Sequence, residues 1–246
     1  MKYDMATLSK YGYVHGYVRM EAERSDTVVP HGDLKECFNY LHNIEPDSFT
    51  SDTDVVADFK ATMSDFYKSC AELSQRLLEI IGRGLELEDP RIFLKAHDGI
   101  IGGDNRSVLR TLYYPALEGD HPVKNGQTRC GEHSDYGSLT LLFQDEVGGL
   151  QVMSSSGEFV DATPIEGTII VNIGDLMQRW TSDKLVSTRH RVLVPSSVDK
   201  KRKTRQSIAF FANPNCKHLI TPVDACDKYP PITVADFLKM KLDSTY

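Results

Sequence analysis

The stretch RCGEHSDYGSLTLLFQDEVGGLQV runs from Arg129 to Val152. His133 and Asp135 stand near its start, and the residues that follow are of the kinds typical of short strands. Side chains two residues apart project to the same side of an extended backbone. If the chain is extended here, two good metal ligands point in one direction at the start of a β-rich region.

Further segments of β type occur between Ser107 and Pro214. They are short, rich in β-branched and aromatic residues, and separated by Gly, Pro, Asp and Ser. Gly148 and Gly149 favour a hairpin turn. Because no helical crossovers lie between the segments, we expect a mainly antiparallel barrel or sandwich. The segments are SVLRTLYYP, SLTLLF, GLQVM, GTIIVNIG, STRHRVLV and RQSIAFFANP.

A helix is expected before this β-rich region. Its apolar positions are three and four residues apart, which places them on one helix face. Asp52 or Thr53 can cap its start, and Gly82 and Gly84 can end it. A single helix of this length is expected to pack on its own domain rather than form a coiled coil. The apolar face comprises Val56, Phe59, Met63, Phe66, Cys70, Leu73, Leu77 and Ile80.

These patterns divide the chain into four regions. A poorly patterned N-terminal region is followed by a helical support region, a β-rich core and a C-terminal helix region. In the last region the segment TVADFLKMKL predicts a helix, with Thr233 and Asp236 as a capping box. The four regions are residues 1–50, 51–106, 107–217 and 218–246.

Composition limits the classes of function. The chain has 246 residues and a formal net charge of -7, which argues against a nucleic-acid-binding role. The basic run Lys200–Arg205 is therefore interpreted as a solvated hairpin loop. Five scattered cysteines fit reduced thiols, and no segment resembles a signal peptide or a membrane span. We expect a cytoplasmic protein that acts on a small molecule and binds neither nucleic acid nor membrane.

A third metal ligand can come from His190, which lies in another expected strand. Two imidazoles and one carboxylate can occupy one face of an octahedron and leave the other face for substrate and oxygen. Arg205 and Ser207 follow, again two residues apart, and a guanidinium beside a hydroxyl suits a carboxylate. Other histidines lack such context and are interpreted as structural: His15, His31, His42, His97 and His121.

The order of several motifs makes a family resemblance specific. They are LRTLYYP, GEHSDYGSLTLL, GGLQV, VNIGDLMQRWTSDKLVSTRHRV and RQSIAFFANPN. On these motifs, residues 11–246 resemble the iron(II)- and 2-oxoglutarate-dependent dioxygenases of the isopenicillin N synthase-like family. The resemblance implies a double-stranded β-helix, or jelly-roll, core with flanking helices.

The resemblance also implies roles for individual residues. His133, Asp135 and His190 would bind Fe(II). The distal carboxylate of 2-oxoglutarate would be held by Arg205 and Ser207, with help from the hydroxyl of Tyr114. Relatives use O2 and 2-oxoglutarate to oxidise a substrate C–H bond, by hydroxylation or a related reaction, and release succinate and CO2.

Two alternatives remain open at this stage. In one, the chain is an oxidase that does not use 2-oxoglutarate, and Arg205 and Ser207 clamp a carboxylate of the substrate itself. In the other, it is a truncated, non-catalytic relative, because the family's N-terminal GFF-x-V-x-N-H-G segment is not found. Such a truncation is expected to uncover a sheet edge and to favour self-association.

Substrate identity does not follow from the motifs. Leu112 and Ser182 stand where many relatives have Asn, so two positions depart from the family pattern. Four residues lie near the inferred site in the sequence and are candidates to contact the substrate. They are Arg110, Arg129, Arg179 and Phe211.

Overall fold

The computed structural model describes residues 16–26, 28–42, 58–117 and 123–243. The strands are β1 Gly16–Val18, β2 Glu36–Tyr40, β3 Val108–Tyr114, β4 Cys130–His133, β5 Leu139–Gln144, β6 Leu150–Met153, β7 Phe159–Asp161, β8 Ile170–Ile173, β9 His190–Val192, β10 Arg205–Ala212, β11 Leu219–Ile220 and β12 Ile232–Thr233. The helices are α2 Phe59–Gly84, α3 Ile92–Ala96, α4 Asp175–Trp180, α5 Val198–Lys201 and α6 Val234–Asp243.

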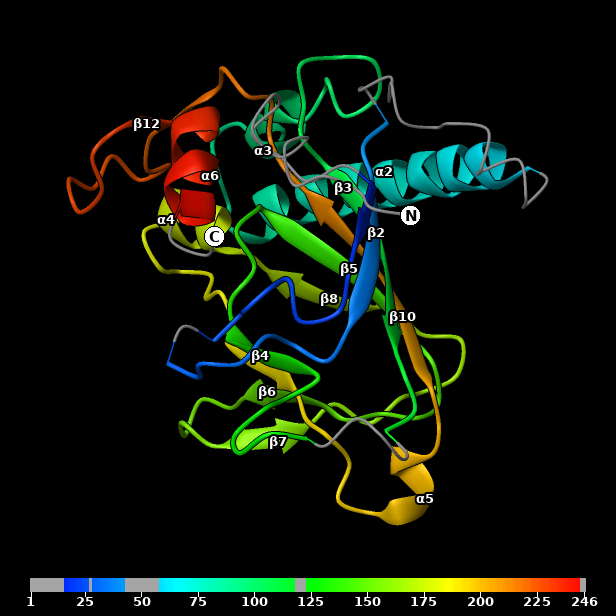
Figure 1. Cartoon of the computed structure of the whole chain (residues 1–246). Helices are drawn as coiled ribbons and strands as arrows, with labels where there is room; N and C mark the ends of the chain where they lie inside the picture. The colour runs from blue at the N-terminus through cyan, green and yellow to red at the C-terminus, as the bar shows by residue number, and fades with distance from the viewer. Residues whose placement is uncertain (1–15, 27, 43–57, 118–122, 244–246) are drawn as a thin grey trace.

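Two antiparallel sheets form the centre of the molecule (Figure 1). The larger sheet has the strand order β1-β2-β3-β10-β5-β8, and the smaller has the order β4-β9-β6-β7. From β3 to β10 the chain passes repeatedly from one sheet to the other, which is the topology of a jelly roll. The predicted fold class, mainly β with flanking helices around a jelly-roll core, is confirmed.

The hairpin predicted at Gly148 and Gly149 is wrong. Both glycines have the positive φ angles that a tight turn requires, 76° and 90°. The turn, however, joins β5 of the larger sheet to β6 of the smaller sheet, and these strands do not pair. A local turn signal indicates where the chain reverses, but not whether it stays in the same sheet.

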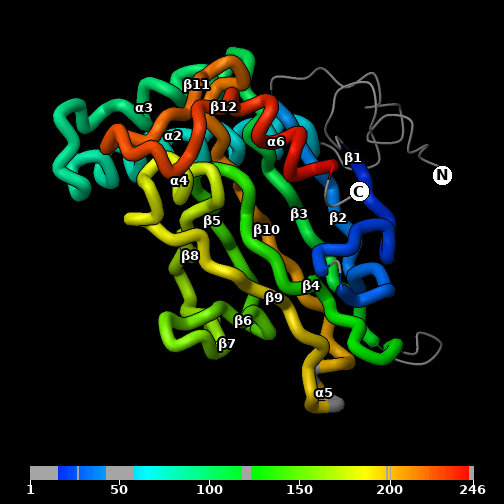
Figure 2. The backbone as a smooth tube through the Cα atoms, turned by 90° about the vertical axis from the view of Figure 1, so that its left-hand side faces the viewer, coloured from blue at the N-terminus to red at the C-terminus, as the bar shows by residue number. Residues whose placement is uncertain are grey.

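The basic run Lys200–Arg205 is not a hairpin loop either. The short helix α5 occupies its first part, and the connection joins β9 in the smaller sheet to β10 in the larger one. Figure 2 shows α5 at the end of the barrel away from α2 and α3. Arg202 and Lys203 are exposed to solvent, as expected for a surface run.

Helix α2 packs on the outer face of the larger sheet. The ring of Phe66 lies 5.1 Å from that of Phe143 on β5, and the ring of Tyr67 lies 5.0 Å from that of Phe210 on β10. Phe210 is fully buried, and burial of such a side chain contributes about 1.5–3 kcal/mol to stability. The larger sheet therefore has an apolar outer face that α2 covers.

The predicted apolar face of α2 is only partly correct. Met63 and Cys70 are buried, but Ile80 is 61% exposed. The buried face is centred instead on the line of Tyr67 and Leu78. The spacing of large apolar residues does not reveal this face, because the small residues Ala71 and Ser74 belong to it. The list of buried residues is Met63, Tyr67, Cys70, Ala71, Ser74, Leu78 and Gly82.

The start of α2 differs from the prediction, and its end agrees with it. The helix begins at Phe59 after Asp58, so its start is later than predicted; Asp52, Thr53 and Val56 lie outside the described residues. It ends at Gly84, as expected. Gly82 is required by packing, because a Cβ atom there would lie 2.0 Å from the carbonyl oxygen of Pro90.

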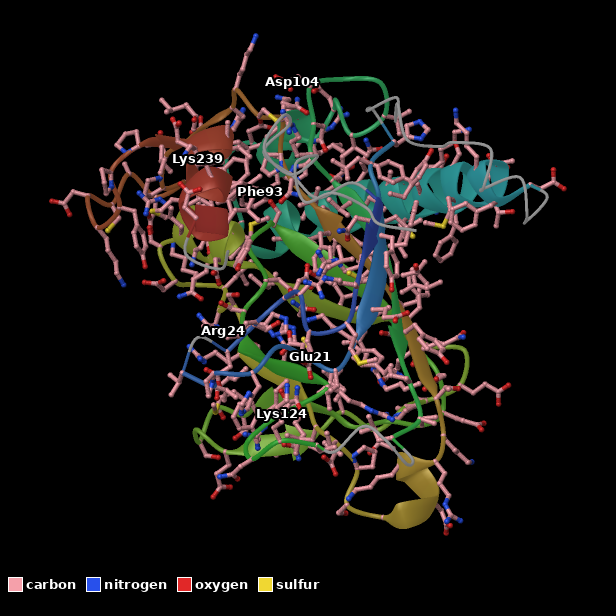
Figure 3. All side chains as sticks on the ribbon, in the orientation of Figure 1. Glu21, Arg24, Phe93, Asp104, Lys124 and Lys239 are labelled. Atoms are coloured by element: carbon pink, nitrogen blue, oxygen red, sulfur yellow. The ribbon has the colours of Figure 1, made fainter. Side chains whose placement is uncertain are left out.

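The structure has two strands, β1 and β2, in the first 50 residues, where the sequence analysis predicts none. β2 pairs with β3, and β1 pairs with β2, so they extend the larger sheet at one edge. The segment between them lies beside β4 (Figure 1). There the backbone nitrogen of Gly131 donates to Oδ1 of Asp33 over 2.9 Å. Glu21 and Lys124, labelled in Figure 3, form an ion pair of 3.0 Å in the same region.

Helix α6 has the predicted capping box. Thr233 Oγ1 accepts a hydrogen bond from the backbone nitrogen of Asp236 over 3.2 Å and donates to the carboxylate of that residue over 2.6 Å. Figure 2 shows α6 between α4 and the strands β1 and β2. Within the described ranges, none of the helices combines the length and the apolar character needed to cross a membrane.

Candidate metal and co-substrate site

A cavity of about 230 Å³ lies between the two sheets. Alternation along the strands decides which side chains face it: Phe210 points to α2, whereas its neighbours Ala209 and Phe211 line the cavity. The polar residues lining it are Glu23, Ser25, Lys35, Asn39, Arg110, Tyr114, Cys130, His133, Ser134, Asp135, Tyr136, Thr140, Asn172, Thr188, His190, Arg205, Ser207 and Asn213. A barrel interior with so many polar groups indicates a binding site rather than a packed core.

His133, Asp135 and His190 come together in this cavity. His133 on β4 is directly opposite His190 on β9, and their ring centroids are 4.3 Å apart. Nε2 of His133 lies 3.9 Å from Oδ1 of Asp135, and Nε2 of His190 lies 3.7 Å from the same oxygen. One donor atom from each residue can be chosen so that all three lie within 4.8 Å of one another.

The two imidazoles have the orientation that a metal ligand needs. Nδ1 of His133 lies 2.8 Å from the carbonyl oxygen of Gly131, and Nδ1 of His190 lies 3.0 Å from that of Thr188. A carbonyl can only accept, so each Nδ1 carries the hydrogen. Nε2 is therefore the nitrogen of each ring that is left to coordinate a metal, as in many protein metal sites.

Asp135 is held so that one oxygen remains for a metal. Its Oδ2 accepts hydrogen bonds from Oγ1 of Thr140 over 2.6 Å and from Nδ2 of Asn172 over 2.8 Å. Burial raises the pKa of this carboxyl, but His190, His133 and the two hydrogen bonds outweigh it and hold the pKa below its usual value. The ionised carboxylate and two neutral imidazole nitrogens form a donor set that suits Fe(II).

The surroundings of His133 favour positive charge. Burial alone lowers the pKa of its imidazole, but Cys130 and Asp135 outweigh burial and raise the pKa to about 9. Burial and the neighbouring His133 lower the pKa of His190. A cation is thus favoured among these groups, which also fits a metal site.

A hydrogen-bonded chain connects this site to α6. Nζ of Lys241 lies 2.7 Å from Oδ2 of Asp175, and that oxygen accepts a hydrogen bond of 3.1 Å from Oγ of Ser134. The backbone nitrogen of Asp175 also donates to the carbonyl oxygen of Asp135 over 2.7 Å. The residues around the metal ligands are therefore fixed by α4 and α6 as well as by the two sheets.

Arg205 and Ser207 lie side by side on β10, as expected. Nη1 of Arg205 donates to Oγ of Ser207 over 3.2 Å, and the guanidinium lies 4.8 Å from the ring centroid of Tyr114. Arg205 is 1% exposed, and its Nε has no hydrogen-bond partner. Its other hydrogen-bond partner is the neutral amide of Gln144, at 3.3 Å.

The guanidinium of Arg205 thus lacks a negative partner. Among the described residues, no carboxylate lies within 4.0 Å of it. A buried charge without a counter-charge is costly, so an anionic ligand would stabilise this position. Such a ligand would also lie in the cavity that contains the candidate metal ligands.

The four candidate substrate residues have different positions. Phe211 and Arg110 line the cavity. Arg129 is fully buried outside the lining and donates to the carbonyl oxygen of Lys203 over 3.1 Å. Arg179 also lies outside the lining, stacked 4.9 Å from the ring centroid of Tyr229. Closeness in the sequence did not correspond to closeness to the cavity for these two arginines.

Several polar residues of the site were missed at the level of sequence. Thr140 and Asn172, which bond Asp135, are polar residues inside apolar strand segments, and that contrast was a usable signal. Glu23, Lys35 and Asn39 come from the region without a recognisable pattern. Nothing in their spacing indicated that they would reach the same cavity.

Glu23, Asp33, Lys35 and Arg110 form a charged cluster on the cavity wall. Both terminal nitrogens of Arg110 lie 3.2 Å from the carboxylate of Glu23, which is also 3.3 Å from Nζ of Lys35. Lys35 forms a second ion pair with Asp33. Burial alone lowers the pKa of Lys35, but Cys130, Glu23 and Asp33 outweigh it and raise the pKa well above its usual value. Lys35 is therefore charged.

Comparison with known proteins agrees with this geometry. Residues 105–214 match the model of the 2OG-Fe(II) oxygenase superfamily. The 2-oxoglutarate-Fe(II) type oxidoreductase ppzD of Metarhizium rileyi is 33% identical over 87% of this chain, which covers 62% of that protein. Proline hydroxylase buaE of Petromyces alliaceus is 37% identical over 74% of this chain, which covers 57% of that protein. The chain spans about 60% of the length of such curated relatives.

Solved structures are similar over more of their length. The structure of full-length Neurospora crassa T7H with alpha-KG has a TM-score of 0.80 and 38% identity, over 94% of this chain and 74% of that one. A structure of T7H with alpha-KG and thymine has the same TM-score and coverage, with 35% identity. The expected family, together with its cofactors Fe(II) and 2-oxoglutarate, is confirmed by these matches.

Proposed function

Because the chain belongs to the 2OG-Fe(II) oxygenase superfamily, we propose that it is an Fe(II)- and 2-oxoglutarate-dependent oxygenase of a small molecule. It would oxidise a C–H bond, by hydroxylation or a related reaction, and release succinate and CO2. One observation carries the proposal: a single cavity contains three convergent metal donors and a buried arginine without a carboxylate partner.

His133, Asp135 and His190 would hold the iron. The second nitrogen of each ring donates a hydrogen bond, and the second oxygen of the carboxylate accepts one. These contacts keep the three side chains in place, so that little reorganisation is needed on binding. Iron bound here, together with 2-oxoglutarate and O2, would supply the oxidising power for the reaction. Three protein ligands leave coordination positions for these partners.

Arg205 and Ser207 would hold the distal carboxylate of 2-oxoglutarate. The guanidinium offers a planar pair of donors, and the hydroxyl of Ser207 adds a third. The hydroxyl of Tyr114 would complete the clamp, because this side chain is buried beside both residues. The clamp would orient the co-substrate so that its other end faces the histidines.

Apolar side chains around the site would exclude water from the reaction. They come from both sheets, so the reacting atoms would be enclosed between them. The residues are Leu112, Leu142, Leu150, Val152, Ile170 and Val192. Leu238 and Leu242 of α6 line the cavity as well and would contribute to the same enclosure.

The names of relatives support a small-molecule substrate. T7H binds thymine in one solved structure, and buaE is named as a proline hydroxylase. Thymine and proline are therefore the first compounds to test, within a wider mixture of metabolites. Action in the cytoplasm stays a prediction.

The test is succinate formation by the full chain. We expect succinate to appear when Fe(II), 2-oxoglutarate, O2 and a suitable substrate mixture are all present, and mass spectrometry to detect a product with one added oxygen or two fewer hydrogens. Product at full rate without 2-oxoglutarate would favour the oxidase that clamps the carboxylate of its substrate. A folded, iron-loaded chain that neither binds 2-oxoglutarate nor turns over would contradict the proposal and favour a non-catalytic relative.

A further inference from the structure

Asn39 on β2 carries a polar atom without a partner. Its Oδ1 accepts a hydrogen bond of 2.6 Å from Nε of Arg110. An Nε–H group can only donate, so this contact determines which side of the amide is oxygen and which is Nδ2. Asn39 lines the cavity, yet its Nδ2 is buried and has no hydrogen-bond partner. A buried donor left unpaired is costly, which indicates that a ligand atom completes it.

The register of the larger sheet places Asn39 across the cavity floor from the candidate metal site. Asn39 is opposite Arg110, Arg110 is opposite Ala209, and Ala209 is opposite Leu142. Thr140, two residues before Leu142 on the same face, bonds Asp135. Ala209 lies in the middle of this row and lines the cavity. Because its side chain is small, it leaves space in the cavity for a substrate between Asn39 and the candidate metal ligands.

Among the residues that the structure describes, the charges of the cluster beside Asn39 are balanced. Glu23 and Asp33 carry two formal negative charges, and Lys35 and Arg110 carry two positive charges, all within one cluster of ion pairs. A ligand carboxylate here would have to compete with Glu23 and Asp33. An uncharged acceptor needs only the free amide hydrogens of Asn39, so the cluster favours a neutral ligand group.

We propose that Nδ2 of Asn39 donates a hydrogen bond to an uncharged carbonyl oxygen of the substrate. The substrate class is then a neutral amide or imide rather than a free carboxylate, and Phe211, which lines the same cavity, offers its ring to the apolar part of the molecule. This inference rests on the proposed function, because it assigns a substrate group to the same cavity.

Pairs of small probes test the charge preference on the unaltered chain. Benzamide is compared with benzoate and uracil with orotate, since only the second member of each pair carries a carboxylate. Equilibrium dialysis without oxygen, on the full chain with Fe(II) and 2-oxoglutarate, gives dissociation constants without turnover. We expect the neutral member of each pair to bind about tenfold more tightly. Equal binding, tighter binding of the carboxylates, or no binding of either neutral probe overturns the inference.

Asn39→Asp tests the donor itself. An aspartate keeps an oxygen for Nε of Arg110 but replaces the free amide group by a second oxygen. We expect about tenfold weaker binding of benzamide and uracil, the order of one lost hydrogen bond. Asn125→Asp makes the same change at an exposed position and is the matched control. If Asn39 serves only to hold Arg110, Asn39→Asp will bind the neutral probes as the parent does, which overturns the inference.

The two proposals can fail separately. If the parent chain does not bind 2-oxoglutarate, the proposed function fails and the inference fails with it. If it binds 2-oxoglutarate but shows no preference for neutral probes, only the inference fails. Should Asn39→Asp not fold, as judged by circular dichroism, the probe pairs on the parent chain decide.

Discussion

Two arginines face the same cavity in opposite electrostatic states. Arg205 on β10 is buried, and its partners are the neutral groups of Ser207 and Gln144. Arg110 on β3 is bound at both terminal nitrogens by the carboxylate of Glu23. Both residues are arginines on adjacent strands of one sheet, so neither residue type nor strand position distinguishes them.

The difference shows how a protein reserves a charge for a ligand. A buried guanidinium without a counter-charge is stabilised only when an anion arrives, whereas one already paired gains little from a second anion. Arg205 is therefore suited to a carboxylate such as that of 2-oxoglutarate. Arg110 is suited to holding Asn39 and the segment that contains Glu23 in place.

The largest expected effect is on Fe(II) binding, which should not depend on either arginine. Asp135→Ala removes one of three protein donors, so we expect Fe(II) affinity to fall by more than about 100-fold. Anaerobic iron titration measures this, with Asp227→Ala as a control at an exposed carboxylate. Equal stoichiometry and affinity in Asp135→Ala and the parent would show that the metal binds elsewhere.

A second change would make Arg110 resemble Arg205. Glu23→Gln keeps the shape of the side chain but removes the carboxylate that pairs with both Arg110 and Lys35 in the described cluster. We expect the free energy of unfolding to fall by about 2–3 kcal/mol, because a largely buried ion pair loses one partner. Urea denaturation measures the loss.

The same variant has a binding readout. With Arg110 no longer neutralised, we expect Glu23→Gln to bind benzoate more tightly than the parent does. Glu166→Gln changes an exposed carboxylate in the same way and should alter neither quantity. An unchanged stability together with unchanged benzoate binding would mean that Glu23 does not neutralise Arg110.

A third change tests the unpaired arginine directly. Arg205→Lys keeps the positive charge but loses the planar pair of donors, so 2-oxoglutarate binding should weaken by about 1.5–3 kcal/mol. The measurement is the apparent Michaelis constant for 2-oxoglutarate at saturating iron. Arg202→Lys, an exposed position on the preceding connection, is the control. An unchanged constant would remove Arg205 from the co-substrate site.

The smallest effect is expected at Ser207. Ser207→Ala removes one neutral hydroxyl and should raise the same constant by an amount equivalent to about 0.5–1.5 kcal/mol. Ser155→Ala is an exposed control. An effect larger than that of Arg205→Lys would mean that the hydroxyl, and not the guanidinium, provides most of the hold on 2-oxoglutarate.

The β-rich core and the cluster of candidate metal ligands were predictable because their signals are local. Strands such as β5 and β10 show as short runs of β-branched and aromatic residues, and they were located within a few residues of their actual bounds. His133, Asp135 and His190 were chosen for their chemistry and their strand context, and the register places the two histidines directly opposite each other.

The rest depended on contacts that no local pattern encodes. The turn at Gly148 was recognised, but its connection between two sheets was not, since that depends on which strands pair far away. β2 was missed because it presents polar Asn39 to the cavity, instead of the apolar side chains that mark a core strand. In the sequence, Arg129 and Arg110 are equally good candidates for contact with substrate. Only the structure shows that Arg110 lines the cavity and that Arg129 is buried outside it.

Contacts between residues far apart in the sequence also have a kinetic consequence. The hydrogen bond from Gly131 to Asp33 spans 98 residues, and that from Asn213 to Arg106 spans 107. A topology of such high contact order is slow to fold, because long loops must close, at a cost in entropy, before the long-range contacts can stabilise the chain. The two histidines are brought together only when β4 and β9 pair, so iron at the proposed site would bind only late. We therefore expect refolding rates that do not depend on iron concentration, and unfolding rates that fall when iron is bound.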